Sequence, residues 1–66
     1  MYRRLIGQMA EKGITRKALA SHLGTTEKTL RNKINGTTDF TWSEIIKTRD
    51  YVAPDMPLEE LFENEI

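Results

Sequence analysis

The segment from Thr15 to Gly36 constrains the fold more than any other part of the chain. Two stretches in it have apolar residues at helical spacing, and Thr15 and Thr26 are suited to capping their N-termini. Between them, Gly24 tolerates a positive φ, and Ala20 lies where a larger side chain would separate two crossing helices. The pattern therefore predicts two helices joined by a sharp turn, a helix-turn-helix.

The whole chain predicts an all-α fold of five short helices, with no convincing strand. We expect the helices near residues 2–11, 16–23, 27–35, 42–52 and 58–63. Gly13 and the pair Asn35–Gly36 are stop signals, and Pro54 and Pro57 break the chain before the last helix. The run TWSE from Thr41 has the form of a capping box, in which the threonine and the glutamate bond to each other's backbone amides.

Apolar residues at helical spacing predict the hydrophobic core. The expected core residues are Leu5, Met9, Leu19, Ala20, Leu23, Leu30, Ile34, Phe40, Ile45, Val52, Leu58 and Leu61. This core is thin, because a domain of this size buries only about 60% of the surface of the unfolded chain. We expect one domain over residues 1–66, with the helix-turn-helix at about 15–36. Gly7 marks either a close approach of another segment or a tolerated weak point in the first helix.

Composition narrows the possible chemistry. The chain has no cysteine and one histidine, His22, which we expect at an exposed or half-buried helix position. Disulfides and thiolate metal sites are excluded, and we expect no metal and no cofactor. The sequence has neither a glycine-rich phosphate loop nor a pair of acids near a plausible cleft, so nothing in it suggests an enzyme. No apolar run approaches the about 20 residues of a membrane span, so we expect an intracellular protein.

The charges are unevenly distributed, although the net charge is zero. Residues 1–49 hold all ten Lys and Arg residues against four acidic residues, a formal charge of +6. Residues 50–66 hold six acidic residues and no basic residue, a formal charge of −6. A basic body with an acidic end can turn its positive side toward phosphates. The alternative is solvated surface charge without a partner.

Several short motifs of one protein family recur along most of the chain, from Leu5 to Phe62. They are EKGIT at 11–15, Leu19–Ala20, Gly24, Leu30, KING at 33–36, FTWSEI at 40–45 and LEELF at 58–62. With these motifs the chain resembles the lambda-repressor and Cro-like family of helix-turn-helix proteins, particularly its small phage and prophage regulators. Many members have glutamine where this chain has Arg16, and that glutamine commonly fixes a phosphate while bracing a recognition-helix side chain.

The resemblance implies a five-helix, lambda-repressor-like DNA-binding domain. Its recognition helix, about residues 27–35, would lie in the major groove, and a weak homodimer would bind a pseudo-palindromic operator. The function we expect from it is sequence-specific binding of double-stranded DNA by a transcriptional regulator, namely a phage-type repressor. The implied location is the cytoplasm of a bacterial cell or of a phage-infected host.

Helix geometry selects candidate base readers. With Leu30 and Ile34 turned toward the core, the residues that project outward are Glu27, Lys28, Arg31 and Asn32. Arg31 or Lys28 could donate to O6 and N7 of guanine, and Asn32 could pair with adenine. Glu27 could accept from N4 of cytosine or stabilise the positive end of the helix dipole. A phosphate contact is the alternative for Arg31.

Contacts with the DNA backbone are expected from segments that flank this helix. The candidates are Thr15, Arg16, Lys17, Thr26, Asn35, Thr37, Thr38, Trp42 and Ser43. Amides at a helix N-terminus suit a phosphate, and such contacts set the register without reading sequence. For Thr37 and Thr38 the alternative is an ordinary solvated turn. We expect Trp42 to cover the edge of the core, with its indole N–H toward solvent or phosphate.

A weak dimer is expected to form through the C-terminal end. Apolar residues there exceed what a short last helix can bury, and the candidate interface is Met56, Leu58, Phe62 and Ile66. Glu59, Glu60, Glu63 and Glu65 would repel one another across a two-fold axis, and salt would relieve that repulsion. The alternative is that Leu58, Leu61 and Phe62 only seal the core of the monomer.

A second class of function stays open from the sequence. The helix-turn-helix scaffold could serve a protein-interaction module or an antitoxin-like protein whose acidic end binds a partner. Retention on heparin or random duplex at low salt distinguishes the two classes, because an interaction module has no reason to bind a polyanion. We expect no membrane and no small-molecule partner.

Overall fold

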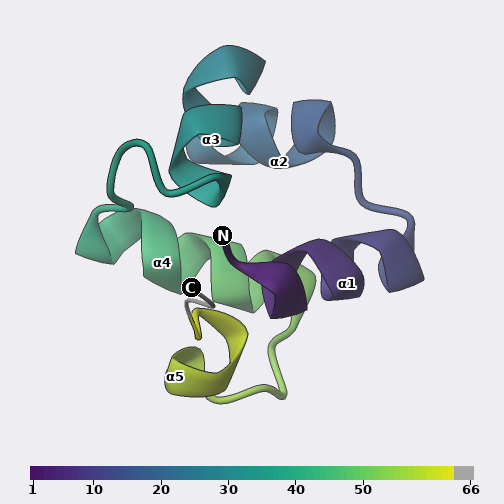
Figure 1. Ribbon diagram of the computed structural model, residues 1–66. Coiled ribbons are helices and arrows are strands. Elements are labelled where there is room, and N and C mark those ends of the chain that lie inside the picture. Colours follow the sequence, from purple (N-terminus) through teal and green to yellow (C-terminus); the bar gives the residue numbers. More distant parts are fainter. Residues whose placement is uncertain (64–66) are drawn as a thin grey trace.

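The computed structural model describes residues 1–63 and contains five helices in that part of the chain. They are α1 (Arg3–Lys12), α2 (Arg16–Leu23), α3 (Glu27–Ile34), α4 (Trp42–Val52) and α5 (Leu58–Leu61). No strand occurs among these residues, which confirms the predicted all-α class. α2 and α3 lie on one side of α1 and α4, and α5 lies on the other side of α4 (Figure 1). α5 is shorter than predicted, ending at Leu61 instead of Glu63.

Three helices begin at the threonine caps that the sequence predicts. Thr15 Oγ1 accepts a hydrogen bond from the amide three residues later at 3.0 Å, and Thr26 Oγ1 does the same at 3.1 Å. At α4 the full capping box forms, with the Glu44 amide 3.2 Å from Thr41 Oγ1 and the Thr41 amide 2.9 Å from the Glu44 carboxylate. These caps satisfy N–H groups that the first helical turn leaves without a partner.

Gly24 makes the sharp turn between α2 and α3. Its φ is 73°, in the left-handed region that favours glycine, as the sequence predicts. The Gly24 amide donates to the Ser21 carbonyl at 3.2 Å, and the Thr25 amide donates to the Ala20 carbonyl at 3.0 Å, which closes the end of α2. Gly7 differs, because a Cβ added there would meet no atom within 4 Å. The interpretation of Gly7 as a close approach is therefore wrong.

The core lies where the helices meet, and most of it was predicted. Nine expected core residues are buried: Leu5, Met9, Leu19, Ala20, Leu30, Ile34, Phe40, Val52 and Leu61. The expectation was wrong for Leu23, Ile45 and Leu58, which are only half-buried. Leu23 and Ile45 pack against the edge of the core, and Leu58 opens a helix of four residues that is too short to enclose it.

Two buried residues were not predicted. Ala53, directly after α4, is 2% exposed. Thr48, in the middle of α4, is fully buried, and its hydroxyl has no hydrogen-bond partner among the described residues. A buried hydroxyl without a partner carries a desolvation cost that a methyl group would not.

Aromatic side chains join segments that are far apart in the sequence. Tyr2, Phe40 and Phe62 pack edge-to-face with ring centroids 5.2 to 5.6 Å apart. This cluster seals the side of the core where both ends of the described chain meet the α3–α4 loop. His22 is exposed, as expected, and stacks on Tyr51 of α4 with centroids 4.3 Å apart.

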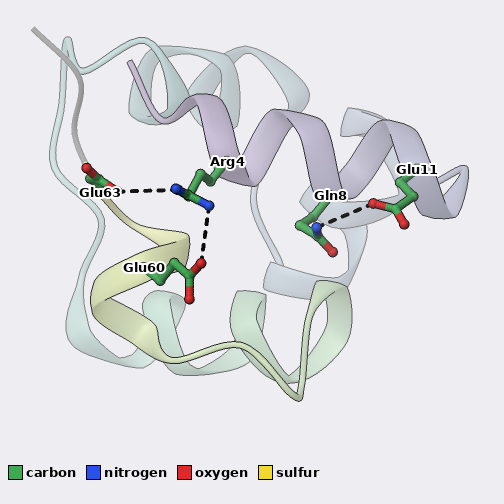
Figure 2. Close-up of polar contacts among 5 residues, drawn as sticks. All are labelled: Arg4, Gln8, Glu11, Glu60 and Glu63. Carbon is green, nitrogen blue, oxygen red and sulfur yellow. Dashed lines mark hydrogen bonds and ion pairs between the residues drawn. The ribbon is translucent and has the colours of Figure 1, made fainter.

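An ion-pair cluster connects α1 with the acidic end of the chain (Figure 2). Arg4 of α1 lies 3.2 Å from a Glu60 oxygen and 3.3 Å from a Glu63 oxygen. All three side chains are about half exposed. Two acids of the C-terminal segment therefore share one cation within the monomer. None of the helices within residues 1–63 has the length and apolar character needed to cross a bilayer.

Candidate nucleic-acid interface

α3 has one side in the core and the other open to solvent. Leu30 and Ile34 are both 0% exposed and fix the rotation of the helix about its axis. Three of the expected base readers are exposed on the outer side: Glu27, Lys28 and Arg31. The fourth, Asn32, is half-buried. The structure thus presents Lys28 and Arg31 to solvent from neighbouring turns of one helix.

A groove of about 440 Å³ connects the outer side of α3 with α2 and α1. Its polar lining comes from the start of α2 and from α3: Thr15, Arg16, Lys17, Glu27 and Arg31. Its apolar lining comes from α1 and the following turn: Ile6, Met9, Ala10 and Ile14. The groove brings expected phosphate contacts and expected base readers onto one surface.

The contribution of α1 to this surface was not predicted. Ile6 and Ile14 are half-buried and pack against the core, and neither was among the predicted core residues. Both are apolar residues in or just after the predicted first helix, and the predicted core does not include them. Apolar residues that the core does not account for were the signal in the sequence for a further apolar surface on this side of α1.

Nine of the ten basic side chains divide into two groups by the partners that the described residues offer them. Arg4, Lys33 and Arg49 form ion pairs, and Lys12 donates to the Val52 carbonyl at the end of α4. Five others make no side-chain hydrogen bond or ion pair with another described residue: Arg16, Lys17, Lys28, Arg31 and Lys47. All of these except Lys47 lie in the first five residues of α2 or α3.

This distribution concentrates uncompensated positive charge at the N-terminal ends of α2 and α3. Exposed cations without an internal partner keep their charge available to an anion. The first amides of α2, those of Arg16 and Lys17, add the positive end of a helix dipole to the same surface. Glu27 is the only acidic residue among those that line the groove.

The Thr26 hydroxyl is engaged in capping the N-terminus of α3. Its hydroxyl accepts from the Thr29 amide and lies 2.8 Å from the Thr29 hydroxyl, to which it donates. Both functions of this hydroxyl are therefore used inside α3. Thr15 uses its oxygen as an acceptor for the Ala18 amide, which leaves its hydroxyl proton for another partner.

The α3–α4 loop folds back on the end of α3. The Thr37 and Thr38 amides donate to the Asn32 carbonyl at 2.9 and 3.3 Å, so these amides have partners inside the protein. The side chains of Asn35, Thr37 and Thr38 are exposed. This loop can therefore offer its side chains, rather than these two amides, to a phosphate.

Trp42 does not cover the edge of the core, contrary to the expectation. As the first residue of α4 it is 69% exposed. The buried side of α4 is set by Thr48 and Val52, and position 42 lies about 100° away from it around the helix. The cluster of Tyr2, Phe40 and Phe62 occupies that edge instead. Ser43, next to Trp42, is also exposed.

An ion pair between Lys33 and Glu44 fixes α3 on α4. The side chains are only 12% and 17% exposed, and the same Glu44 oxygen accepts from the Thr41 amide. Burial raises the pKa of the Glu44 carboxyl, but hydrogen bonds from Lys33 and Thr41 outweigh it and hold this pKa below its ordinary value of 4.5. The capping box was predicted from the sequence, whereas its link to α3 was not.

The expected dimer residues are partly engaged inside the monomer. Met56 packs against the core, and Phe62 belongs to the aromatic cluster. Leu58 is half-buried, and Ile66 lies outside the described residues. For Phe62 the contacts agree with the alternative, in which it seals the core of the monomer. The dimer itself stays a prediction.

Metal chemistry has no assembled site in the described part of the chain, where no three His, Asp or Glu side chains come together. Comparison with known proteins does not place the chain in a family: no protein-family model, no curated protein and no solved structure matches it.

Proposed function

We propose that this protein is a transcriptional regulator that binds double-stranded DNA sequence-specifically, with α3 in the major groove. The observation that carries the proposal is a set of four exposed cations that pair with no other described residue and lie within the first five residues of α2 and α3: Arg16, Lys17, Lys28 and Arg31. The proposal includes a lambda-repressor-like fold and a repressor role without catalysis, in the cytoplasm of a bacterial cell or an infected host.

The dimensions of α3 fit this role. An α-helix with its side chains is about 10–12 Å across, and the major groove of B-DNA is about 12 Å wide and admits such a helix. Arg31 and Lys28 would donate to guanine O6 and N7 from the outer side of α3. Glu27, which also lines the groove, would accept from cytosine N4 or stabilise the positive end of the helix dipole. Asn32 reaches adenine only if its half-buried side chain turns outward.

Phosphates would be held on both sides of α3. On one side are the Thr15 hydroxyl, the first amides of α2 and the side chains of Arg16 and Lys17. On the other side are the exposed side chains of the α3–α4 loop and the first amides of α4, near Ser43. These contacts set the position of α3 in the groove, whereas α3 itself reads the bases.

Two copies are required for useful specificity, because one short helix reads only a few base pairs. In this proposal two copies bind half-sites about 34 Å apart on a pseudo-palindrome. The acidic α5 supports such an orientation, because it lies across α4 from α2 and α3 and so faces away from the phosphates (Figure 1). A weak dimer is sufficient when DNA supplies the alignment.

The experiment that tests the function is a binding selection from a randomised duplex library, followed by titration of the recovered duplex at several salt concentrations. We expect one recurring pseudo-palindromic sequence and an affinity that falls steeply with salt. Failure to bind heparin, random duplex or any selected duplex at low salt would contradict the proposal and favour the protein-interaction alternative.

A matched pair of lysine variants locates the surface. Lys17→Ala removes an unpaired cation from α2, and Lys47→Ala removes an unpaired cation from α4, outside the groove. We expect Lys17→Ala to weaken binding to all duplexes and to reduce the slope of log K against log salt by about 1, because one phosphate contact is lost. Lys47→Ala should change neither. Equal effects of both variants would place the DNA elsewhere.

A further inference from the structure

The groove between α1, α2 and α3 has an apolar half that the proposed DNA contacts do not use. That half consists of Ile6, Met9 and Ala10 of α1 and of Ile14 in the turn that follows. Ile6 and Ile14 are half-buried and Ala10 is exposed, so apolar atoms border the groove directly. DNA contacts are made mostly to phosphates, sugars and the polar edges of bases, with the thymine methyl as the main apolar group. DNA therefore does not account for this half of the groove.

The opposite half of the groove is cationic. Arg16, Lys17 and Arg31 border it, are exposed, and form no ion pair with another described residue. Glu27 lies on the same border, so three cations and one acid give this half a formal charge of +2. The Thr15 hydroxyl, also on this border, keeps its proton for an acceptor. An anion placed here is attracted by three cations and displaces no ion pair between described residues.

The dimensions of the groove favour a small ligand over a docked helix. Its volume of about 440 Å³ lies within the range of about 300 to 1,000 Å³ that is typical of small-molecule sites. The α1 part of the apolar half extends from Ile6 to Ala10, about 6 Å along the helix axis. A docked amphipathic helix places its anchors at i, i+4 and i+7, over about 10 Å. One short alkyl chain covers the apolar half, whereas a helix would extend beyond it.

We propose that the groove binds a small alkyl carboxylate, whose chain lies on the apolar half and whose carboxylate is held by Arg16, Lys17 and Arg31. A guanidinium can hold both oxygens of a carboxylate at once. Composition alone did not suggest a small-molecule partner, because the segments that form this groove meet only in the folded chain. The same three cations hold DNA in the proposed function, so the carboxylate competes with the duplex. That competition rests on the proposed function, whereas carboxylate binding by the free protein does not.

Octanoate is the probe, and isoleucine δ1 methyl resonances report where it binds. We expect octanoate to shift Ile6 and Ile14 and to leave unchanged Ile45 and Ile46 of α4, which lie outside the groove. Octyltrimethylammonium has the same chain with the opposite charge and should shift neither Ile6 nor Ile14. Butanoate should bind about tenfold more weakly than octanoate, which corresponds to about 1.4 kcal/mol, roughly what the burial of two methylene groups supplies. Equal shifts by both octyl compounds would overturn the proposal, as would the absence of shifts at Ile6 and Ile14.

Two pairs of charge variants test the two halves of the groove. Ala10→Glu places an anion in the apolar half, and Gly7→Glu adds the same charge to α1 outside the groove, where a Cβ meets no atom within 4 Å. Arg31→Gln removes a cation from the groove, and Lys47→Gln removes one from α4. We expect Ala10→Glu and Arg31→Gln to weaken octanoate binding by about threefold or more, and their controls to bind as wild type does. Equal weakening by a variant and its control would overturn the proposal.

Circular dichroism verifies that the four variants fold. Because Arg31 is exposed and forms no ion pair with another described residue, Arg31→Gln keeps the test valid if Ala10→Glu does not fold. A peptide arm covers the other class of ligand. An acidic amphipathic peptide that shifts the Ile6 and Ile14 methyls, where octanoate shifts neither, would overturn the proposal and assign the groove to a protein partner.

Competition is measured by titrating the selected duplex in the presence of octanoate, with butanoate at the same concentration as the control for ionic strength. Octanoate at its own Kd should raise the apparent Kd for the duplex about twofold, as mass action requires when two ligands exclude each other. An unchanged duplex affinity while octanoate occupies the groove would overturn the competition. If no duplex binds at all, the proposed function fails, and the methyl shifts of the free protein still decide whether the carboxylate site exists.

Discussion

The α2–α3 end of the molecule and its α1–α5 end use charge in opposite ways. At the first, Arg16, Lys17, Lys28 and Arg31 stand exposed and make no ion pair with another described residue. At the second, Arg4 forms ion pairs with both Glu60 and Glu63, so that the cation is fully engaged inside the protein (Figure 2). A net charge of zero therefore hides one surface whose cations make no ion pair and one whose cation is paired with acids.

The pairing of the charges distinguishes the two ends more clearly than the number of charges does. An exposed ion pair contributes little stability and leaves little field for a partner, whereas unpaired cations on one face produce a positive potential. Substitutions at the two ends should accordingly have separate effects, on DNA binding at the first and on stability at the second.

The largest effect is expected from Arg31→Ala at the unpaired end. Loss of a bidentate guanine contact should cost about 1 to 3 kcal/mol on the selected duplex and relax the preference at one base pair. Unfolding stability should not change, because the Arg31 side chain has no polar partner among the described residues. Titration against the selected duplex and its single-base variants measures both properties. An unaltered base profile would reject Arg31 as a base reader.

The same glycine substitution should act with opposite sign in the two regions. Gly24→Ala forces a side chain into φ of 73° at the α2–α3 turn and should destabilise the protein by about 1 to 2 kcal/mol. Gly7→Ala in α1 meets no atom within 4 Å and should stabilise it by about 0.5 to 1 kcal/mol. Urea unfolding of the two variants gives the comparison. A neutral Gly24→Ala would contradict the turn geometry.

The Lys33–Glu44 pair should make the attachment of α3 to α4 sensitive to acid. Since the folded-state pKa of Glu44 lies below its ordinary 4.5, its ionised form contributes stability that is complete above about pH 4.5. That contribution is lost as the pH falls through the lowered pKa. We expect the stability difference between wild type and Glu44→Gln to be constant near neutral pH and to shrink in this acidic range. A difference independent of pH down to 3 would contradict the assignment.

The smallest effect is expected from Arg4→Ala at the paired end. The ion pairs of Arg4 are about half exposed, and exposed pairs contribute about 0 to 1 kcal/mol. DNA affinity and its salt dependence should not change, because Arg4 is engaged with α5 and lies outside the groove. Thermal unfolding and duplex titration measure the two quantities side by side. A loss of DNA affinity comparable to that of Lys17→Ala would contradict the expectation that only the α2–α3 end contacts DNA.

Local interactions made the helices predictable. The caps at Thr15, Thr26 and Thr41 and the left-handed turn at Gly24 involve residues within four positions of one another. Such short-range contacts are specified by residue type and spacing, which are visible in the sequence. The outward position of Lys28 and Arg31 followed in the same way, because Leu30 and Ile34 fixed the buried side of α3.

Where prediction failed, the outcome depended on how helices cross. Trp42 was expected at the core edge, but the cluster of Tyr2, Phe40 and Phe62 fills that edge. Leu23 and Ile45 have core-like spacing yet lie at the rim, because burial depends on which helices surround a residue. The apolar spacing of one helix cannot specify which neighbours enclose it.

Sequence alone was enough to predict the all-α class, the threonine caps of three helices and the rotation of α3, since these follow from local residue types and apolar spacing. Which charges pair with one another follows only from the folded structure, because Lys33 meets Glu44 across 11 positions and Arg4 meets Glu60 across 56. The folded structure also decided that α1, α2 and α3 share one groove and that Trp42 stays outside the core. Contacts at such separations depend on the packing of whole helices, and that packing is a property of the folded chain alone.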